Sequence, residues 1–552
     1  MKTRKFLLVG IISIAITCGL TALKNSDDKN FEISKQLNIY ATLFRDVNMF
    51  YVDDIKPDEL VTNSIKSMLK SLDPYTLYYP ESETEDVKLM TTGEYAGIGS
   101  VISKKGDVVI IREPYKNSPA HKAGLLPGDI ILSIDGHSVK GKDTEGVSAL
   151  LKGQPGKEIT IKVQREFEPK PLEKKAIREK IQLPSVPYYG MVNDSTGYIF
   201  LSSFTDKSAA DVRTAIITLK NQGAASLIMD LRGNPGGLLD QAVEIVNFFI
   251  PKNSKVVNTK GKVKQWDKEY TTTKNPIVPD MPLAVLIDRG SASASEIVSG
   301  SLQDLDRAVL IGERSFGKGL VQTVRDLAYN TKLKVTTAKY YIPSGRCIQA
   351  LDYSHRNPDG SVGKIPDSLI NEYQTKAGRK VYDGGGISPD IKIDTEEFAR
   401  ITQELVLQDI TFDFVNTYAL KHPTIAPINE FKITDDIYNE FKNYLKTKKF
   451  SYETESQQIL NKLIEVAKTE KYYDTSKTQI EELQKDFAHS IDRDMDLFKE
   501  EIISFLTQQF IQRYYFLEGV IEYKVNHDKE VAKAIEILGN NNEYQNLLNP
   551  KK

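Results

Sequence analysis

The chain of 552 residues is long enough for several domains, and its 40% hydrophobic and 27% charged residues are typical of folded globular proteins. The 73 Lys and Arg residues nearly balance the 75 Asp and Glu residues, so the net charge of −2 argues against a protein that binds nucleic acid. Two cysteines exclude a disulfide scaffold, a Cys-based zinc site and an iron–sulfur cluster, and six His residues without a His-Glu-x-x-His motif argue against a metal enzyme, so we expect no metal and no cofactor.

The first 23 residues have the pattern of an export sequence. A basic head of Lys2, Arg4 and Lys5 precedes the uncharged run Phe6–Leu23. That order is typical of a secretory signal peptide and also of a short membrane anchor, and the sequence leaves both open. In either case the rest of the chain works outside the cytoplasm, so we expect a periplasmic protein, free or anchored in the inner membrane.

The pattern of apolar residues changes near residue 90. Residues 24–90 place apolar side chains at helical spacing, as at Ile39, Leu43 and Val47. Residues 91–165 instead show short apolar runs separated by glycine turns. We therefore expect a helical N-terminal region followed by a β-rich module.

Residues 166–393 alternate between strand and helix patterns. After a charged connector with several prolines, Ser226–Asp230 and Leu283–Ile287 read as buried strands. Each is followed by an amphipathic segment, Leu238–Phe249 and Ser293–Gln303. The alternation predicts an α/β core with a largely parallel sheet.

Residues 394–552 are highly charged and almost wholly helical in pattern. An apolar stripe at Phe498, Ile502, Phe505 and Leu506 predicts helices that bury one face. Such a face can pack on the α/β core, associate with a second copy in a homo-oligomer, or dock a partner protein. The sequence leaves these alternatives open.

Three glycine-rich segments interrupt the α/β region: Asp230–Gly237, Gly290–Glu296 and Gly312–Gly319. The first two follow a buried strand and precede a helix, where open α/β sheets place their active sites. The third fits most of a phosphate-binding loop, but Gly319 stands where such loops have Ser or Thr for Mg²⁺. An exported protein also lacks an ATP supply, so nucleotide hydrolysis is the weaker alternative.

The second segment carries candidate nucleophiles. Ser291, Ser293 and Ser295 lie at a strand-to-helix junction, where a serine either caps the helix or attacks a carbonyl whose oxyanion the helix N-terminus stabilises. No His lies in the glycine-rich segments, so Lys318 is the available base. A lysine among apolar neighbours can lose its proton near neutral pH, and the alternative is an ordinary solvated loop lysine. In an extended segment Gln322 shares a face with Lys318 and can orient that amine.

These segments resemble the active-site segments of the C-terminal processing (tail-specific) serine peptidases. The resemblance runs from about Leu72 to Ile393. It implies a catalytic Ser/Lys dyad in which Ser293 is the nucleophile, Lys318 is the base and Gln322 supports the lysine.

The segment Leu231–Gly237 is similar to the oxyanion-hole segment of the same family. The resemblance implies that the amide of Gly237 is one oxyanion donor and that of Ala294 the second. Gly236 remains an alternative to Gly237.

Residues 91–165 resemble the PDZ domain of these peptidases, with Ser118–Gly136 as the clearest signature. A PDZ domain binds the carboxylate of a peptide C-terminus with backbone amides and takes the peptide as an extra strand. The resemblance implies that the peptide-binding residues are Ala96, Gly97, Ile98 and Gly99.

The sequence thus predicts a multidomain α/β protein, with a β-rich PDZ module joined to an α/β serine-peptidase core and helical N-terminal and C-terminal regions. The expected regions are a signal peptide or anchor (1–23), N-terminal helices (24–90), the PDZ domain (91–165), the peptidase core (166–393) and a C-terminal helical extension (394–552). The expected function is an exported serine endopeptidase that recognises protein or peptide substrates by their free C-termini. An inactive PDZ scaffold is the alternative, although both members of the dyad are present.

Overall fold

The computed structural model describes residues 30–394, 397–487 and 490–549. The apolar run Phe6–Leu23, expected to be a signal or an anchor, lies outside these residues. Within them, no helix combines the length and the apolarity needed to cross a membrane. The described residues divide into two compact units, the smaller of which holds residues 30–80 together with 324–335.

The smaller unit contains the N-terminal helices. A helix covers 30–50, and α2 (Pro57–Lys70) follows with a proline in its first turn, where the missing N–H costs no hydrogen bond. Strand β1 (Leu77–Tyr79) pairs antiparallel with the first residues of β18 (Lys332–Tyr341). The helical spacing of the sequence therefore does form helices here.

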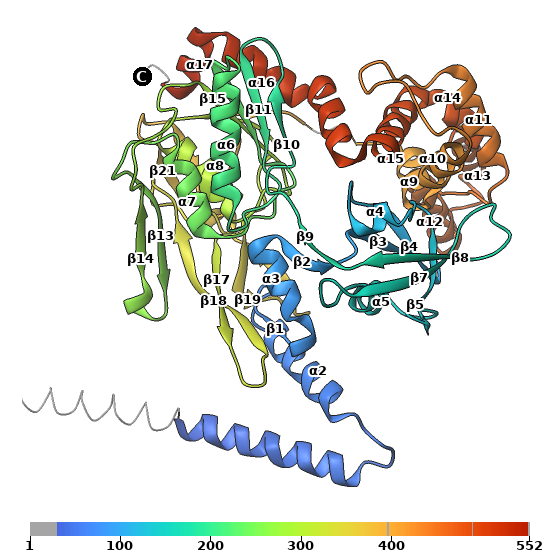
Figure 1. Cartoon of the computed structure of the whole chain (residues 1–552), viewed down its shortest axis with the longest axis horizontal. Coiled ribbons are helices and arrows are strands. Elements are labelled where there is room, and N and C mark those ends of the chain that lie inside the picture. The colour runs from blue at the N-terminus through green and yellow to red at the C-terminus, as the bar shows by residue number, and fades with distance from the viewer. Residues whose placement is uncertain (1–29, 395–396, 488–489, 550–552) are drawn as a thin grey trace, which may run out of the picture. The chain divides into compact units, whose positions relative to one another are not determined.

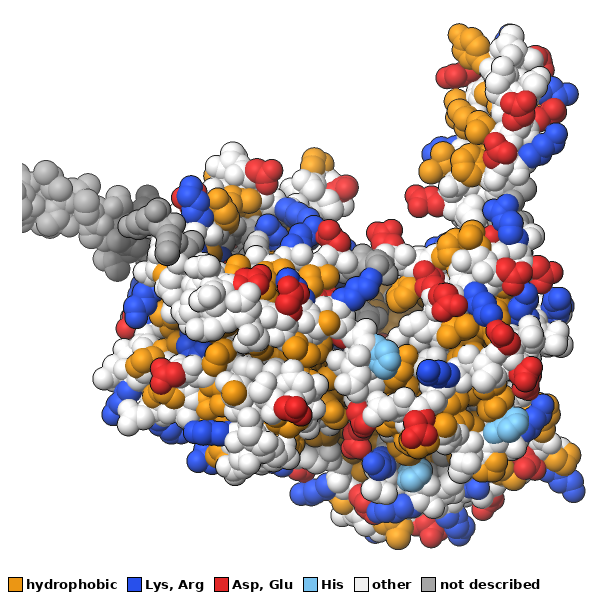
Figure 2. All heavy atoms as spheres, turned by 90° about the horizontal axis from the view of Figure 1, so that it is seen from above, with side chains coloured by type: hydrophobic (Ala, Val, Ile, Leu, Met, Phe, Trp, Pro, Cys, Tyr) orange, Lys and Arg blue, Asp and Glu red, His pale blue; other side chains and the backbone are white. Residues whose placement is uncertain are grey.

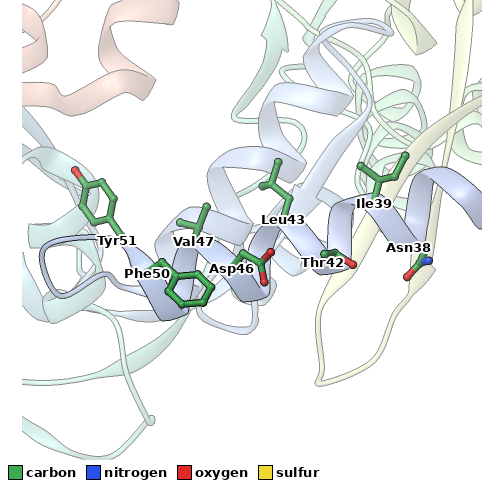
Figure 3. A pocket seen from close by; sticks show the side chains of 8 residues that line it. All are labelled: Asn38, Ile39, Thr42, Leu43, Asp46, Val47, Phe50 and Tyr51. Atoms are coloured by element: carbon green, nitrogen blue, oxygen red, sulfur yellow. The ribbon is translucent and has the colours of Figure 1, made fainter.

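The helix over 30–50 keeps its apolar side chains exposed. Figure 3 shows Ile39, Leu43, Val47 and Phe50 along one pocket of this helix, and each is at least 37% exposed. An amphipathic pattern therefore predicts the helix correctly but does not, by itself, imply that its stripe is buried.

The larger unit begins with a β-rich module. Its sheet has the order β3-β4-β5-β7-β8, with β6 beside β5, and the pairs are antiparallel. Ile111, Ile159 and Ile161 are fully buried in its core. The elements are α3 (Thr84–Thr92), β2 (Glu94–Gly97), β3 (Ser100–Lys105), β4 (Val108–Pro114), α4 (Pro119–Lys122), β5 (Ile130–Ile134), β6 (His137–Ser138), α5 (Thr144–Leu151), β7 (Glu158–Gln164), β8 (Leu172–Ile177) and β9 (Glu179–Gln182).

The charged stretch expected to be a connector contains two of these strands. β8 extends the sheet beyond β7, and β9 pairs antiparallel with β2. In β8 only Ala176 is buried, while Glu173, Lys175 and Ile177 are exposed. An edge strand with one solvated face carries charged residues, which is why the composition indicated a connector.

The α/β core is built on a largely parallel sheet, as the sequence predicted. The strand order is β10-β11-β12-β15-β16-β23, with only the β10–β11 pair antiparallel. The strands are β10 (Tyr188–Met191), β11 (Thr196–Phe200), β12 (Ser226–Asp230), β15 (Leu283–Ile287), β16 (Val309–Gly312) and β23 (Ile391–Lys392). Both faces are covered, which explains the continuous apolar runs of β12 and β15.

Different parts of the chain cover the two faces of this sheet (Figure 1). Helices α6 (Ser208–Asn221), α7 (Leu239–Asn247) and α8 (Ala294–Asp304) share one apolar core with it. The other face packs against α16 (Lys529–Gly539) and α17 (Asn541–Leu548). The end of the C-terminal extension is therefore the third layer of the α/β core.

Shorter strands flank this core. β13 pairs with β14 and β18, and β17 pairs with β18. These and the remaining elements are β13 (Lys255–Gly261), β14 (Lys268–Thr271), β17 (Leu320–Asp326), β19 (Leu351–Arg356), β20 (Val362–Lys364), β21 (Glu372–Gln374) and β22 (Lys380–Tyr382).

The rest of the C-terminal extension is helical, as predicted, and builds a separate core. Phe414, Phe441 and Phe510 are at most 1% exposed at its centre. The helices are α9 (Arg400–Leu407), α10 (Ile410–Lys421), α11 (Asp435–Lys446), α12 (Glu455–Thr469), α13 (Lys477–Asp486), α14 (Ile491–Leu497) and α15 (Lys499–His527).

This helical part holds the β-rich module through polar contacts. Arg112 of β4 forms an ion pair with Asp409, and its guanidinium lies 4.0 Å from the ring centroid of Phe412. Glu113 of β4 accepts a hydrogen bond from Gln512 of α15 (2.7 Å). The extension therefore contacts both the β-rich module and the α/β core.

Basic and acidic side chains are interspersed over the face of the molecule in Figure 2. A surface that collects a polyanion would instead carry a broad basic patch. This face therefore agrees with the balanced charge of the sequence.

We expect Ile537→Ala in α16 to lower the free energy of unfolding by about 2–5 kcal/mol, because Ile537 is fully buried against the sheet and its loss leaves a cavity. Urea denaturation followed by circular dichroism measures the change. Glu536→Ala on the solvent side of α16 is the control and should change stability by no more than about 0.5 kcal/mol. Equal stability of the two variants would contradict the packing of α16 on the sheet.

Candidate active site

Three loops converge at one edge of the α/β sheet. β12, β15 and β16 are neighbouring parallel strands, so their carboxyl ends lie at the same edge. The loops that leave them cover 231–238, 288–293 and 313–319. The three glycine-rich segments singled out in the sequence are therefore brought together.

The first two loops are joined by hydrogen bonds that also sort the candidate serines. The hydroxyl of Ser291 donates to the carbonyl of Leu231 (2.8 Å), and that of Ser295 donates to the carbonyl of Asn234 (2.9 Å). The backbone N–H of Ala292 donates to the same Asn234 carbonyl (3.0 Å). Ser291 and Ser295 are fully buried, so their hydroxyls serve the loop structure.

Ser293 lies between them in a different environment. It is only partly buried, and its backbone has φ 55° and ψ −109° at the start of α8. A positive φ in a residue with a side chain costs about 1–3 kcal/mol and persists only where the surroundings hold it. The turn sets Ser293 at a helix N-terminus, where Ala294 is the first helical residue and its N–H has no acceptor within the helix.

A buried carboxylate connects this turn to the third loop. Oε2 of Glu296 accepts hydrogen bonds from the backbone N–H of Ser293 (2.8 Å) and of Lys318 (2.9 Å). Oε1 accepts from the N–H of Gly317 (2.7 Å) and the hydroxyl of Ser315 (2.5 Å). One oxygen atom therefore binds the main chain of both proposed dyad residues.

The electrostatics of Glu296 follow from this position. Its side chain is fully buried, and desolvation raises the pKa of the carboxyl group. The hydrogen bonds from Ser315, Lys318, Ser293 and Gly317 act in the opposite direction because they favour the charged form. Burial thus disfavours the charged form of the Glu296 carboxyl group, and four hydrogen-bond donors compensate for that cost.

Lys318 lies in the loop between β16 and β17 and is partly buried. Gly317 before it has φ 88°, and a Cβ there would lie 2.4 Å from Cβ of Ala350, so only glycine fits this turn. Gln322 is in β17, where its amide donates to the hydroxyl of Thr336 in β18 (3.3 Å). The segment after Lys318 is extended, as the sequence predicted.

The first loop packs Gly236 against the serine turn, whereas the next residue, Gly237, packs against Phe204. A Cβ on Gly236 would lie 2.8 Å from Cβ of Ser293 and 2.9 Å from N of Ala294, so this loop packs directly on the turn. The N–H of Gly236 already donates to the side chain of Asn234 (2.9 Å). That bond favours Gly237 over Gly236 as the amide free for an oxyanion.

The proposed peptide-binding residues lie at the end of β2 and in the short connection to β3. Ala96 and Gly97 belong to β2 and pair with β9. Ile98 is 2% exposed and part of the module's core, so its side chain packs inside the module. Gly99 has φ 72°, and the next residues form β3, an edge strand of the sheet.

Sequence reasoning missed the role of Glu296. The Ser293-x-x-Glu296 spacing indicated a helix cap, and the bond from the Ser293 N–H is the expected one. Glu296 also accepts hydrogen bonds from Gly317 and Lys318, which lie about twenty residues further along the chain, and its local pattern gave no sign of these contacts. A buried acidic residue in a capping box beside a glycine-rich loop is the signal that could have pointed to it.

The described residues contain no group of three or more His, Cys, Asp and Glu side chains that could hold a metal ion. The groups that the three loops bring to the sheet edge are a hydroxyl at a helix N-terminus, a lysine amine from the adjoining loop and backbone amides.

Three family models match the chain. Residues 195–359 match "Peptidase family S41", 110–165 match "PDZ domain", and 401–538 match "Probable PDZ-protease, C-terminal helical domain". These ranges cover the sheet edge with its three loops, the β-rich module and the helical extension.

Curated relatives agree with these matches. The carboxy-terminal-processing protease of Bartonella bacilliformis is 35% identical over 66% of this chain and 82% of its own. The "Probable CtpA-like serine protease" of Staphylococcus saprophyticus is 35% identical over 66% of this chain and 71% of its own. A solved structure titled photosystem II D1 C-terminal processing protease is 27% identical, covers 64% of this chain and 92% of its own, and aligns with a TM-score of 0.36.

The predicted fold class and the resemblance stated from the sequence are thus confirmed. The chain belongs to peptidase family S41, the family of the carboxy-terminal-processing serine proteases, and carries that family's PDZ domain.

Proposed function

We propose that this chain is an exported serine endopeptidase in which Ser293 and Lys318 form the catalytic dyad. The observation that carries the proposal is the shared acceptor Oε2 of Glu296, which binds the backbone N–H of both residues. Ser291 and Ser295 use their hydroxyls in the loop structure, which leaves Ser293 as the candidate nucleophile.

The proposed mechanism follows from these positions. The neutral amine of Lys318 takes the proton of the Ser293 hydroxyl, whose oxygen attacks the scissile carbonyl. The amides of Gly237 and Ala294 stabilise the oxyanion, aided by the positive end of the α8 dipole. Lys318 then protonates the leaving amine, and water hydrolyses the acyl-enzyme. Gln322 positions Lys318 from the adjoining strand.

The alternative of nucleotide hydrolysis is disfavoured by the third loop. A phosphate-binding loop directs its backbone N–H groups at the phosphates. Here the N–H groups of Gly317 and Lys318 donate to the carboxylate of Glu296 instead. The carboxylate of Glu296 therefore already uses the N–H groups that a phosphate would need.

We expect Ser293→Ala and Lys318→Ala each to lower kcat for a peptide substrate by about 10³-fold or more, and the double variant to fall little further, because the pair acts as a unit. Lys318→Arg should be equally inactive, since a guanidinium cannot act as a base. Activity should rise with pH as Lys318 loses its proton.

Steady-state cleavage of an unfolded protein measures these effects. Ser202→Ala, a partly exposed serine after β11, is the matched control and should retain wild-type activity. Activity that survives in Ser293→Ala would contradict the assignment of the nucleophile.

We also propose that the PDZ domain selects substrates by a free C-terminus. The edge strand β3 offers unpaired backbone groups to a peptide added as a further strand, and α5 lies against it. The segment Ala96–Gly99, which ends β2 and leads into β3, supplies the backbone amides for the terminal carboxylate, which forms charge-assisted bonds that an amide cannot replace.

Two peptides of identical sequence, one with a free apolar C-terminus and one amidated, test this selection. The amidated peptide should show a clearly lower kcat/KM, by about ten-fold, because it loses the charge-assisted bonds. Equal rates would mean that the PDZ domain does not read the terminal carboxylate.

The location is a separate proposal that rests on the basic head and the run Phe6–Leu23. Cell fractionation should recover the protein in the periplasm or at the outer face of the inner membrane. N-terminal sequencing then distinguishes a cleaved signal from a retained anchor, and recovery of full-length active protein from the cytosol would overturn the proposal.

A further inference from the structure

The loop that carries Gly236 and Gly237 is also held from the far side of the sheet. Arg232, two residues after β12, donates through Nε to both oxygens of Asp230 (3.0 and 3.1 Å). Its Nη1 donates to Oδ2 of Asp528 (2.8 Å) and lies 3.2 Å from Oε2 of Glu530. Both of these acids belong to the C-terminal extension.

Asp528 is fixed in place by its own helix. It is the N-cap of α16, and its Oδ1 accepts hydrogen bonds from the N–H of Glu530 (2.9 Å) and Val531 (3.0 Å). Its other oxygen is left for Arg232. Because α16 packs its buried face on the sheet, the carboxylate is held rigidly relative to β12.

The opposite end of the network is equally constrained. Asp230 is 2% exposed, and its Oδ2 accepts a hydrogen bond from the hydroxyl of Tyr198 (2.7 Å). Its Oδ1 also accepts from the backbone N–H of Arg232 (2.9 Å). The guanidinium therefore lies between one carboxylate of the core and two of the extension, and only 20% of its side chain is exposed.

A short, hydrogen-bonded loop connects Arg232 to Gly236. The N–H of Asn234 donates to the carbonyl of Leu231 (3.1 Å), and the N–H of Gly236 donates to the Asn234 side chain. Gly236 in turn packs on the Ser293 turn. A displacement of the guanidinium would therefore shift Gly236, and Gly237 after it, relative to the Ser293 turn.

We propose that Asp528 and Glu530 are positioning residues for the protease reaction: the C-terminal extension holds Arg232 and thereby sets the oxyanion loop against Ser293. This inference rests on the proposed oxyanion role of Gly237. The extension is then part of the active site's support, in addition to its contacts with the PDZ domain. Neither acid touches the substrate.

Asp528→Asn is the most informative variant, because asparagine caps a helix as well as aspartate does and so preserves α16 while it removes the charge. We expect Asp528→Asn with Glu530→Gln to lower kcat by about ten-fold or more, since oxyanion donors act only at close distance. KM and the melting temperature should remain near those of the full-length wild-type chain.

Glu536→Gln is the matched control on the same helix, where the side chain is exposed and pairs with Lys533. It should leave kcat unchanged. An equal loss in Glu536→Gln, or an unchanged kcat in the double variant, would overturn the inference.

A double-mutant cycle with Arg232→Gln tests the route. If the two acids act through Arg232, their removal in the Arg232→Gln background should cost much less than in the wild type. The same fold-loss in both backgrounds would show that they act by another route. If the wild-type chain cleaved no peptide, the proposed protease function itself would be refuted. Failure of the positioning inference and failure of the proposed function therefore give different results.

Discussion

One buried charge determines how the site is assembled. Removing the carboxylate of Glu296 from water is costly, and it is acceptable only because four donors surround it. Three of those donors are backbone N–H groups, and loss of the acceptor would leave each unsatisfied at a cost of about 1–3 kcal/mol. The loop at Lys318 and the turn at Ser293 therefore have one low-energy arrangement relative to each other, in which both face the same edge of the sheet.

The sheet topology makes that constraint possible. Because β12, β15 and β16 are adjacent and parallel, segments separated by tens of residues leave the sheet within reach of one another. The strained backbone of Ser293 persists because hydrogen bonds hold its own peptide groups and the residue before it. The N–H of Ala292 donates to the Asn234 carbonyl and the N–H of Ser293 to Glu296, while the Ser293 carbonyl accepts from the hydroxyl of Tyr340 in β18. Hydrogen bonds to the main chain thus hold the site together.

The sequence was sufficient for what depends on local pattern. Apolar periodicity predicted the parallel core and the helical extension, and the glycine-rich segments marked the edge where the three loops meet. It failed where a contact joins distant segments: Glu296 read as an ordinary helix cap, and the charges of β8 concealed an edge strand. The local pattern did not choose among the three serines, and only the family resemblance named Ser293. In the structure the hydroxyls of Ser291 and Ser295 are buried and bonded to the first loop, whereas Ser293 is partly buried.

The C-terminal extension illustrates the same limit on a larger scale. An amphipathic stripe shows that a helix buries a face, but not what the face meets. In the structure the extension does two different things. Helices α9, α10, α11 and α14 and most of α15 form their own core beside the PDZ domain, while the end of α15, α16 and α17 cover one face of the peptidase sheet. Arg232 lies where α16, on the face of this sheet, meets the loop that carries Gly236 and Gly237. A segment that covers a sheet face is therefore also in a position to act on the chemistry at that sheet's edge, and the charges at the start of α16 are the physical link between the two.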